Sequence, residues 1–266
     1  MSIRLGPHLG ECIAAADRPL AGMWVCSGSP VVAEICAGSG LDWLLIDMEH
    51  APNGLASVLA QLQAVAAYPV TPVVRVPSND PVVIKQVLDL GAQSILVPMV
   101  TDAREAELAV SAAHYPPRGV RGVGSALARS ARWNRVDGYL TEATSHVSVF
   151  VQIESIDAVS AASEIAAVDG ISGVFVGPSD LAASMGHLGD QGNVSVVAAV
   201  LSTFAAVHEQ GKPVGVNAFV PTVADRYAAE GADFILVDAD VAMLARGSES
   251  LAARWTPNSA TITESY

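Results

Sequence analysis

Several polar side chains follow short apolar runs, where they could together form one active site. Asp47, Glu49 and His50 follow the apolar run Trp43–Ile46. Further candidates come after later runs, at Arg75, Gln152, Glu154 and Asp180. Carboxylates suit Mg²⁺ or Mn²⁺, a guanidinium can stabilise an enolate, and an imidazole can exchange protons near neutral pH. These residue types predict an oxygen-rich metal site with a cation and a proton carrier beside it.

Glu154 and Asp180 are the candidate metal ligands, because they follow two successive apolar runs and no cysteine lies nearby. Each also has a simpler interpretation. Asp180 could cap the N-terminus of a helix over Leu181–Met185, and Glu154 could be a solvated residue in a first helical turn. The residues alone leave both interpretations open.

Arg75 and His50 also have two interpretations each. Arg75 could bind a carboxylate or stabilise an enolate, or it could form a structural ion pair with Asp47 or Glu49. His50 could be a general base or proton shuttle, or it could be a hydrogen-bonded loop residue. The sequence does not choose between these roles.

Other catalytic motifs are weak or missing. The stretch Gly177–Asp180 could cradle a phosphate at a helix N-terminus, but it lacks the multiple glycines and the Lys of a P-loop. The glycines of Gly119–Gly124 do not follow a suitable strand, so they are not a dinucleotide fingerprint. Lys85 falls on a predicted helix and Lys212 precedes a predicted strand, which disfavours a covalent imine mechanism.

Eight apolar runs bounded by turn residues predict the strands that position these groups. The runs are Gly22–Val25, Trp43–Asp47, Pro72–Val76, Ile95–Pro98, Val147–Ile153, Gly173–Gly177, Pro213–Asn217 and Phe234–Asp238. Segments between them, such as Gly54–Ala67, Asp80–Leu90 and Pro221–Glu230, have the composition of helices. A doubly wound open sheet would share this alternation, but eight units favour a closed (β/α)8 TIM barrel, whose strand C-termini meet at one mouth. We expect one barrel domain over residues 1–255 and a polar tail over residues 256–266.

Two connections are unusually long for such a barrel. One runs from Pro98 to Val147 and the other covers Leu181–Gly192. Long connections at the carboxyl ends of strands often carry function, so both are candidate functional loops.

Composition excludes several classes of partner. The chain has 266 residues with a net charge of −13, which disfavours nucleic acids and anionic membranes as partners. No apolar run reaches the roughly 18 residues of a membrane span, and Met1–Arg4 does not resemble the start of a signal peptide. Cys12, Cys26 and Cys36 have no spacing typical of a disulfide framework. We therefore expect reduced thiols and a cytoplasmic protein that acts on small molecules.

The ordered motifs of the chain resemble the HpcH/HpaI class II pyruvate aldolases. The resemblance covers roughly residues 18–255 and is carried by Trp43–Asn53, Pro72–Arg75, Ile84–Asp89, Tyr115–Arg135, Val151–Ser155 and Gly173–Leu181. It implies a barrel of the phosphoenolpyruvate/pyruvate superfamily type that reversibly joins pyruvate to an aldehyde. The first half most resembles members that cleave 4-hydroxy-2-oxoheptanedioate. The stretch Gly177–Gly189 equally resembles those that cleave 2-dehydro-3-deoxyglucarate.

The resemblance also implies roles for individual residues. Glu154 and Asp180 would bind a divalent cation, Mg²⁺ or Mn²⁺, with Co²⁺ as a further option. Gln152 would hold the metal shell or the pyruvate. The backbone around Gly177, Pro178 and Ser179 would bind the pyruvate carboxylate. Arg75 would stabilise the enolate oxygen.

Proton transfer would involve the first of the polar clusters. His50 would assist it, oriented by a carboxylate that the family places at Asp89, with Asp47 beside it. The family further implies a homo-hexamer in which a C-terminal helix packs on a neighbouring subunit. Asn217 and Met48 depart from the family pattern and could change the preference for the aldehyde. An enzyme that is chiefly an oxaloacetate decarboxylase, or a silent binding protein for pyruvate-like acids, would share most of these residues.

Overall fold

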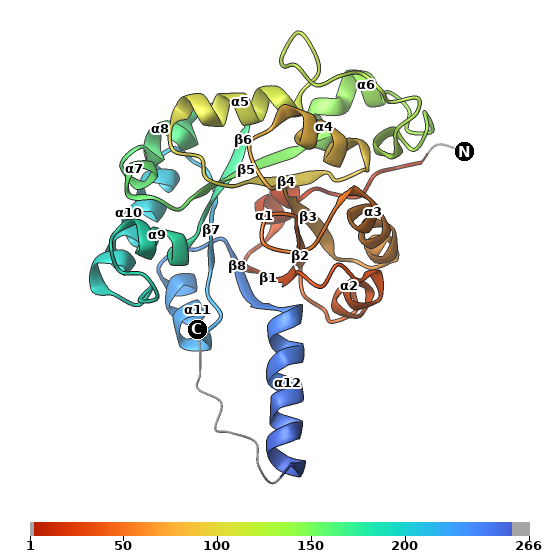
Figure 1. The fold of residues 1–266 in the computed structure, drawn as a ribbon. Coiled ribbons are helices and arrows are strands. Elements are labelled where there is room, and N and C mark those ends of the chain that lie inside the picture. The colour runs from red at the N-terminus through yellow and green to blue at the C-terminus, as the bar shows by residue number, and fades with distance from the viewer. Residues whose placement is uncertain (1–2, 257–266) are drawn as a thin grey trace.

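Eight parallel strands pair in chain order and close into a barrel, which confirms the predicted (β/α)8 fold (Figure 1). The structure, a computed structural model, describes residues 3–256. The strands are β1 Leu20–Val25, β2 Trp43–Asp47, β3 Thr71–Arg75, β4 Ser94–Val97, β5 Ser148–Ile153, β6 Ile171–Val176, β7 Val214–Asn217 and β8 Phe234–Ala239. Each strand lies within two residues of its predicted limits, because buried parallel strands are continuous apolar runs.

The barrel interior is filled by aromatic and aliphatic side chains. The ring of Trp43 contacts Gly22, and the ring of Phe234 contacts Gly215, at positions where a Cβ would clash. Phe175 lies edge-on to Trp43 at 6.5 Å between ring centroids. Glycine is needed at these strand positions because only a strand without a side chain lets a ring pass across it. Because the interior is filled, the polar side chains lie at the ends of the strands.

Helices surround the barrel and alternate with its strands. They are α1 Leu9–Ala15, α2 Pro30–Ala37, α3 Leu55–Ala64, α4 Pro81–Asp89, α5 Ala103–Ala113, α6 Tyr139–Glu142, α7 Ile156–Ser160, α8 Ala162–Ala167, α9 Pro178–Ser184, α10 Val194–Glu209, α11 Pro221–Ala229 and α12 Asp240–Trp255, with short 3₁₀ turns η1 Val65–Ala67, η2 Arg129–Ala131 and η3 Ala143–His146. Side chains of Ser29, Asp80 and Asp102 cap the N-termini of α2, α4 and α5. Gly91 and Gly231 follow α4 and α11 with φ of 96° and 103°, as the predicted helix ends require.

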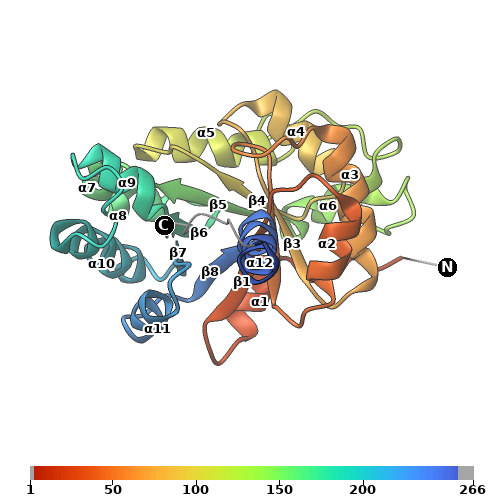
Figure 2. The same cartoon turned by 60° about the horizontal axis from the view of Figure 1, so that its bottom comes forward.

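The final helix, α12, extends away from the barrel instead of packing along it (Figures 1 and 2). Asp240 at its start is its one buried residue. The side chains of Val241, Leu244, Leu251 and Trp255 are exposed. The helix therefore presents apolar surface that the described part of this chain leaves uncovered.

The remaining sequence predictions concern the loops, the cysteines and the tail. The long connection after β4 contains α5, η2, α6 and η3, and the connection after β6 begins with α9. Cys12, Cys26 and Cys36 are free thiols. Across residues 3–256, none of the helices has the length and apolarity required to span a bilayer. The predicted polar tail falls, apart from Thr256, outside the described residues.

Candidate active site at the mouth of the barrel

A cavity of about 280 Å³ lies at the carboxyl ends of the strands. The residues that line it include most of the predicted site: Asp47, His50, Arg75, Gln152, Gly177, Pro178, Ser179, Asp180 and Asn217. They follow five different strands, from β2 to β7, so the barrel brings together groups that are far apart in sequence. Active sites of (β/α)8 barrels lie at this end of the strands.

Arg75 is fixed by a two-point ion pair with Asp47. Its Nε and Nη2 donate to the two carboxylate oxygens at 2.8 and 2.9 Å, and both side chains are buried. The Trp24 ring lies against the guanidinium, 4.2 Å from ring centroid to Cζ. The structural ion pair is therefore present. It orients the remaining nitrogen, Nη1, toward the site, where it lies 3.5 Å from Gln152 Oε1.

Glu49 takes part in this arrangement, as the second of the two predicted ion-pair partners of Arg75. Its Oε2 lies 2.9 Å from Arg75 Nη1. Burial raises the pKa of Glu49, and Asp47 and Asp180 raise it further, while Arg75 opposes them. Arg75 is thus shared between the carboxylates of Asp47 and Glu49. Its guanidinium supplies the positive charge on this side of the mouth.

Asp47 also holds the loop that carries His50. Its carboxylate accepts hydrogen bonds from the backbone N–H groups of Glu49 and His50 at 3.0 and 3.2 Å. Asn53 Nδ2 donates to the Asp47 carbonyl at 2.7 Å. The imidazole of His50 lies at the rim with 68% of its side chain exposed. Asp47 therefore positions the backbone of His50 and leaves the ring free to meet a ligand.

The expected contact between Asp89 and His50 is absent within the chain. Asp89 is the last residue of α4, and a helix that follows a strand in a barrel runs back toward the opposite end. Its carboxylate accepts a hydrogen bond from Arg121 Nη2 at 2.8 Å. Within one chain, Asp89 therefore forms an ion pair with Arg121, which lies on the long connection after β4.

Glu154 is a buried carboxylate, so its interpretation as a solvated helical residue is wrong. It is 3% exposed. Its oxygens accept hydrogen bonds from Met99 N at 2.7 Å and from Gln152 Nε2 at 2.5 Å. Burial is the main cause that raises the pKa of Glu154 to about 7, and the charges of Asp180 and Glu49 add to it. A buried anion with anionic neighbours is the arrangement that a bound cation would stabilise.

Asp180 is the third residue of α9 and does not cap it. The helix begins three residues earlier than predicted, with Gly177 as its N-cap and Pro178 at its first position. A Cβ on Gly177 would lie 2.9 Å from both Gln152 Nε2 and Glu154 Oε2. The absence of a side chain at Gly177 therefore keeps space open beside these two groups.

The donor set fits a divalent cation that keeps open positions. Glu154 and Asp180 are the carboxylates on this side of the mouth, while Asp47 is saturated by Arg75 and backbone N–H groups. No cluster of three or more His, Cys, Asp or Glu side chains able to hold a metal occurs among residues 3–256. Two carboxylates with water or substrate oxygens in the other positions is a common environment for Mg²⁺.

Sequence reasoning missed two residues that shape the mouth. Trp24 supports Arg75 and also donates from Nε1 to Asn217 Oδ1 at 2.7 Å. Asp240, at the start of α12, accepts hydrogen bonds from the N–H groups of Cys26 and Ser27. Burial, together with Asp47 and Asp240, raises the pKa of Cys26 to about 12. That thiol is therefore protonated at neutral pH and unsuited to nucleophilic attack.

The fold and these groups define a (β/α)8-barrel protein with an acidic, arginine-containing site at the strand C-termini. The family model described as HpcH/HpaI aldolase/citrate lyase matches residues 20–247, and the chain belongs to this family. It is 51% identical to the 4-hydroxy-2-oxo-heptane-1,7-dioate aldolase of Klebsiella pneumoniae subsp. pneumoniae over 94% of both chains. It is 52% identical to the enzyme of the same name from Salmonella arizonae, over 90% of this chain and 91% of that enzyme.

A solved structure agrees with this assignment. An HpcH/HpaI aldolase/citrate lyase family protein from Burkholderia cenocepacia J2315 superimposes with a TM-score of 0.89 and 40% identity. The superposition covers 92% of this chain and 98% of that one. The resemblance inferred from the motifs is therefore confirmed.

Proposed function

We propose that the protein is a metal-dependent pyruvate aldolase, a carbon–carbon lyase that cleaves a 4-hydroxy-2-oxo acid to pyruvate and an aldehyde. The observation that supports it most is the rigid, buried Arg75 at the same mouth as the carboxylates of Glu154 and Asp180. Family membership and the names of the relatives at 51–52% identity favour 4-hydroxy-2-oxoheptanedioate as the substrate.

Glu154 and Asp180 would hold a divalent cation, Mg²⁺ or Mn²⁺. The bound ion would supply Lewis-acid stabilisation of the negative charge that develops on the keto oxygen of pyruvate. Gln152, hydrogen-bonded to Glu154, would orient the pyruvate, and the segment from Gly177 to Ser179 would bind its carboxylate. These groups line the same wall of the cavity or support it.

Arg75 would stabilise the same developing charge from the other side. Its guanidinium is held by Asp47, so it needs no reorganisation when the charge forms. A fixed cation of this kind typically contributes on the order of 10²–10³ in rate. Arg75 keeps its proton throughout, so the proton of the reaction must be carried by another group.

His50 is the residue that would carry that proton. Its backbone is fixed by Asp47 while its ring lies at the rim, where the aldehyde would enter. Asn217 and Trp24 form a hydrogen-bonded pair that also lines the cavity and would contact the aldehyde portion. The polar Asn217 favours an aldehyde that carries a hydroxyl or carboxylate group.

Removing the metal tests this proposal. Excess chelator should abolish pyruvate release from the hydroxy-oxo acid, and added Mg²⁺ or Mn²⁺ should restore it. Full activity in excess chelator would exclude the proposal. Oxaloacetate decarboxylation needs the same enolate stabilisation without an aldehyde, so both rates should be measured on one preparation. A higher rate of decarboxylation would favour the decarboxylase, and a panel of aldehydes would separate the heptanedioate from the glucarate type.

We further propose that the protein is a homo-oligomer, with the hexamer that the family resemblance implies. The support is α12, which carries Val241, Leu244, Leu251 and Trp255 at spacings of three, seven and four residues along one face. A single helix in water gains nothing from such an apolar stripe, whereas a neighbouring subunit could cover it.

A further inference from the structure

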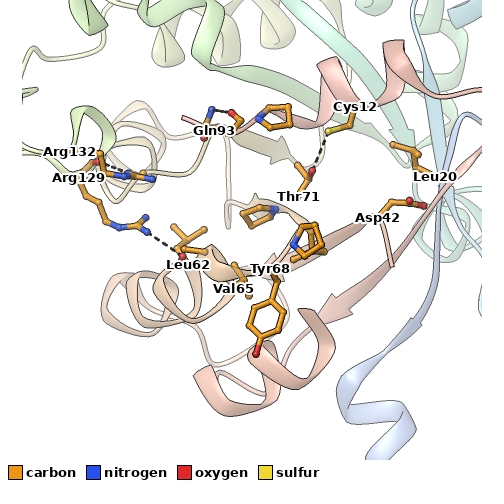
Figure 3. A pocket seen from close by; sticks show the side chains of 17 residues that line it. Cys12, Leu20, Asp42, Leu62, Val65, Tyr68, Thr71, Gln93, Arg129 and Arg132 are labelled. Carbon is orange, nitrogen blue, oxygen red and sulfur yellow. Dashed lines mark hydrogen bonds between the residues drawn. The ribbon is translucent and has the colours of Figure 1, made fainter. Parts of the chain in front are cut away.

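A cavity larger than the one at the mouth lies at the end of the barrel opposite the candidate active site. It has a volume of about 540 Å³ and lies beneath the N-terminal ends of the strands, among the segment before α1, the turn η1 and the turn η2 (Figure 3). Its lining includes Leu20 and Thr71, the first residues of β1 and β3. Cavities of this size bind small organic molecules.

Two arginines from η2 and the residue after it form one side of this cavity. Arg129 and Arg132 both line it, and both are half-buried. Their Nη1 atoms lie 2.8 and 3.0 Å from the point that a Cβ on Gly91 would occupy. The two guanidinium groups therefore converge on one place, which is free of a side chain only because residue 91 is glycine.

These two charges have no carboxylate partner. Among residues 3–256, the arginines that form ion pairs with carboxylates are Arg18, Arg75, Arg118, Arg121 and Arg246. In the same part of the chain, no carboxylate lies within 4 Å of Arg129 or Arg132. The nearest acid in the cavity wall, Asp42, is already neutralised by two hydrogen bonds from Arg18 at 2.8 Å. Burial, and then the charge of Arg132, lowers the pKa of Arg129 to about 10. In a chain with a net charge of −13, the cavity is a local site of uncompensated positive charge.

The hydrogen bonds within the chain use only some of the N–H donors of Arg129 and Arg132. Arg129 donates to the carbonyls of Leu90 and Leu62 at the ends of α4 and α3, and Arg132 donates to the Arg129 carbonyl. A guanidinium carries five N–H groups, so most of the donors in this pair remain unused. The hydrogen bonds to the ends of α4 and α3 explain the position of Arg129. They do not explain why the guanidinium of Arg132 lies beside it.

The backbone at Arg132 is itself strained. Arg132, Trp133 and Asn134 are consecutive non-glycine residues with φ of 49°, 56° and 65°. Left-handed conformations cost free energy for residues with a Cβ, and they are concentrated at functional and ligand-binding positions. Here they direct the Arg132 guanidinium back over η2, toward Arg129 and the cavity (Figure 3).

Another part of the wall is apolar. Leu62 and Val65 line it together with the ring of Tyr68 (Figure 3). Pro72 is also part of the lining. The Tyr68 hydroxyl donates to Glu34 at 3.3 Å. Exposed Ala66 and Pro69 lie at the rim. A ligand that fits would place an anionic group against the arginines and an apolar body along this wall.

The geometry points to a second binding site, at the base of the barrel, for a small organic anion whose carboxylate or phosphate lies between Arg129 and Arg132. Two planar guanidinium groups side by side match the oxygens of either head group. The site is separate from the aldolase chemistry, because strand N-termini and strand C-termini lie at opposite ends of the barrel.

Binding should be measured by calorimetry and thermal denaturation on the intact protein in low-salt zwitterionic buffer with chelator. The probes are phenyl phosphate, cyclohexanecarboxylate and inorganic phosphate. We expect at least one organic anion to raise the thermal midpoint by a few degrees at millimolar concentration and to bind more tightly than inorganic phosphate. The better of the two organic probes identifies the head group.

Two variants locate the site. Arg132→Gln should weaken binding at least tenfold and, without anion, leave the thermal midpoint unchanged or higher, because it relieves repulsion between like charges. Ala66→Phe should weaken binding while keeping both arginines, because it fills the cavity from its exposed rim. Arg135→Gln is the matched control, since this exposed arginine lies beside Trp133 and does not line the cavity. The inference is overturned if no probe binds at 10 mM, or if affinity is unchanged in both variants.

Discussion

In Arg75, a structural ion pair is compatible with the chemical role that we propose for the same side chain. Asp47 holds two of its nitrogens at 2.8 and 2.9 Å, and Trp24 supports its flat face. A guanidinium held in this way cannot swing into solvent, so its charge is already in place when a substrate anion forms. The ion pair is what makes Arg75 useful at the mouth.

Replacing Arg75 with lysine tests this two-point geometry. Arg75→Lys keeps the charge, but one ammonium group cannot bond both Asp47 oxygens and also face the cavity. We expect kcat for pyruvate release to fall about 10²-fold or more, with a lower thermal midpoint because buried Asp47 loses a partner. Steady-state rates and calorimetry measure the two effects. Arg118→Lys, in an exposed pair with Asp169, should leave both nearly unchanged. A rate within twofold of the wild type would contradict the role.

For single residues, the sequence predicts which side chains lie together at the mouth, but not which hydrogen bonds and ion pairs each of them forms. Strand-end positions were sufficient to place Asp47, Arg75 and Asp180 at one mouth. They could not show that Glu154 is buried or that Arg75 pairs with both Asp47 and Glu49, because both depend on the packing of adjacent loops. Within the chain Asp89 pairs with Arg121 at the end of a helix that returns toward the opposite end of the barrel, so the role of Asp89 in orienting His50 stays a prediction.

The element that shapes the side of the mouth proposed to hold the metal is α9. Its N-terminus comes directly after β6, with Gly177 as N-cap and Pro178 at the first helical position. Proline is favoured there because its missing N–H would have no partner within the helix. This start places Asp180 in the first turn, facing the mouth rather than capping the helix.

A methyl group at Gly177 should disable the site without unfolding the barrel. The Cβ of Gly177→Ala would lie 2.9 Å from Gln152 Nε2 and Glu154 Oε2, so both groups must shift. We expect kcat to fall at least tenfold, because small displacements of catalytic groups are costly. Gly192→Ala is the control, since its nearest neighbour would be Asp190 at 3.9 Å. Equal activity of the two variants would show that Gly177 is not needed for space.

Elements were predicted more closely than the sites between them. Buried parallel strands and capped helices have local signatures, so all eight strand limits agree to within two residues. The cavity at the base has no such signature. It depends on how the N-terminal segment, η1 and η2 pack together, and the pattern of residues 129–132 gives no indication of an enclosed space.

For the whole molecule, the apolar face of α12 predicts association between chains. Leu244→Glu combined with Leu251→Glu would place two charges on that face, where burial against another subunit would become costly. Sedimentation velocity should show a smaller species than the wild type. Glu249→Gln, which changes charge on the same helix without affecting the apolar stripe, should sediment like the wild type. An unchanged assembly in the double variant would contradict a role for this face.

Acid stability should depend on His114, which is 4% exposed. Burial, with Arg118 and Arg121 nearby, lowers the pKa of His114 to about 4 from 6.5. The unfolded chain takes up this proton first as the pH falls. The contribution of His114 is therefore complete above pH 6.5 and is lost as the pH falls toward 4, on the order of 3 kcal/mol in total.

Thermal denaturation across this pH window measures the effect. His114→Gln cannot titrate, so its thermal midpoint should fall less steeply between pH 6.5 and 4 than that of the wild type. His187→Gln, in the loop after α9, should keep the wild-type slope. Parallel slopes for the wild type and His114→Gln would show that this histidine does not control acid stability.

The exchange of pyruvate methyl protons with solvent is the most direct test of the proposed chemistry, because it needs enolate formation and no aldehyde. Proton NMR in D₂O would follow loss of the methyl signal with wild-type protein. With Mg²⁺, exchange should be fast; it should stop in excess chelator and return when Mg²⁺ is restored, and Arg75→Ala should reduce it at least 10²-fold. Exchange that continues unchanged in excess chelator, or that is absent from folded, Mg²⁺-saturated protein, would contradict the assignment.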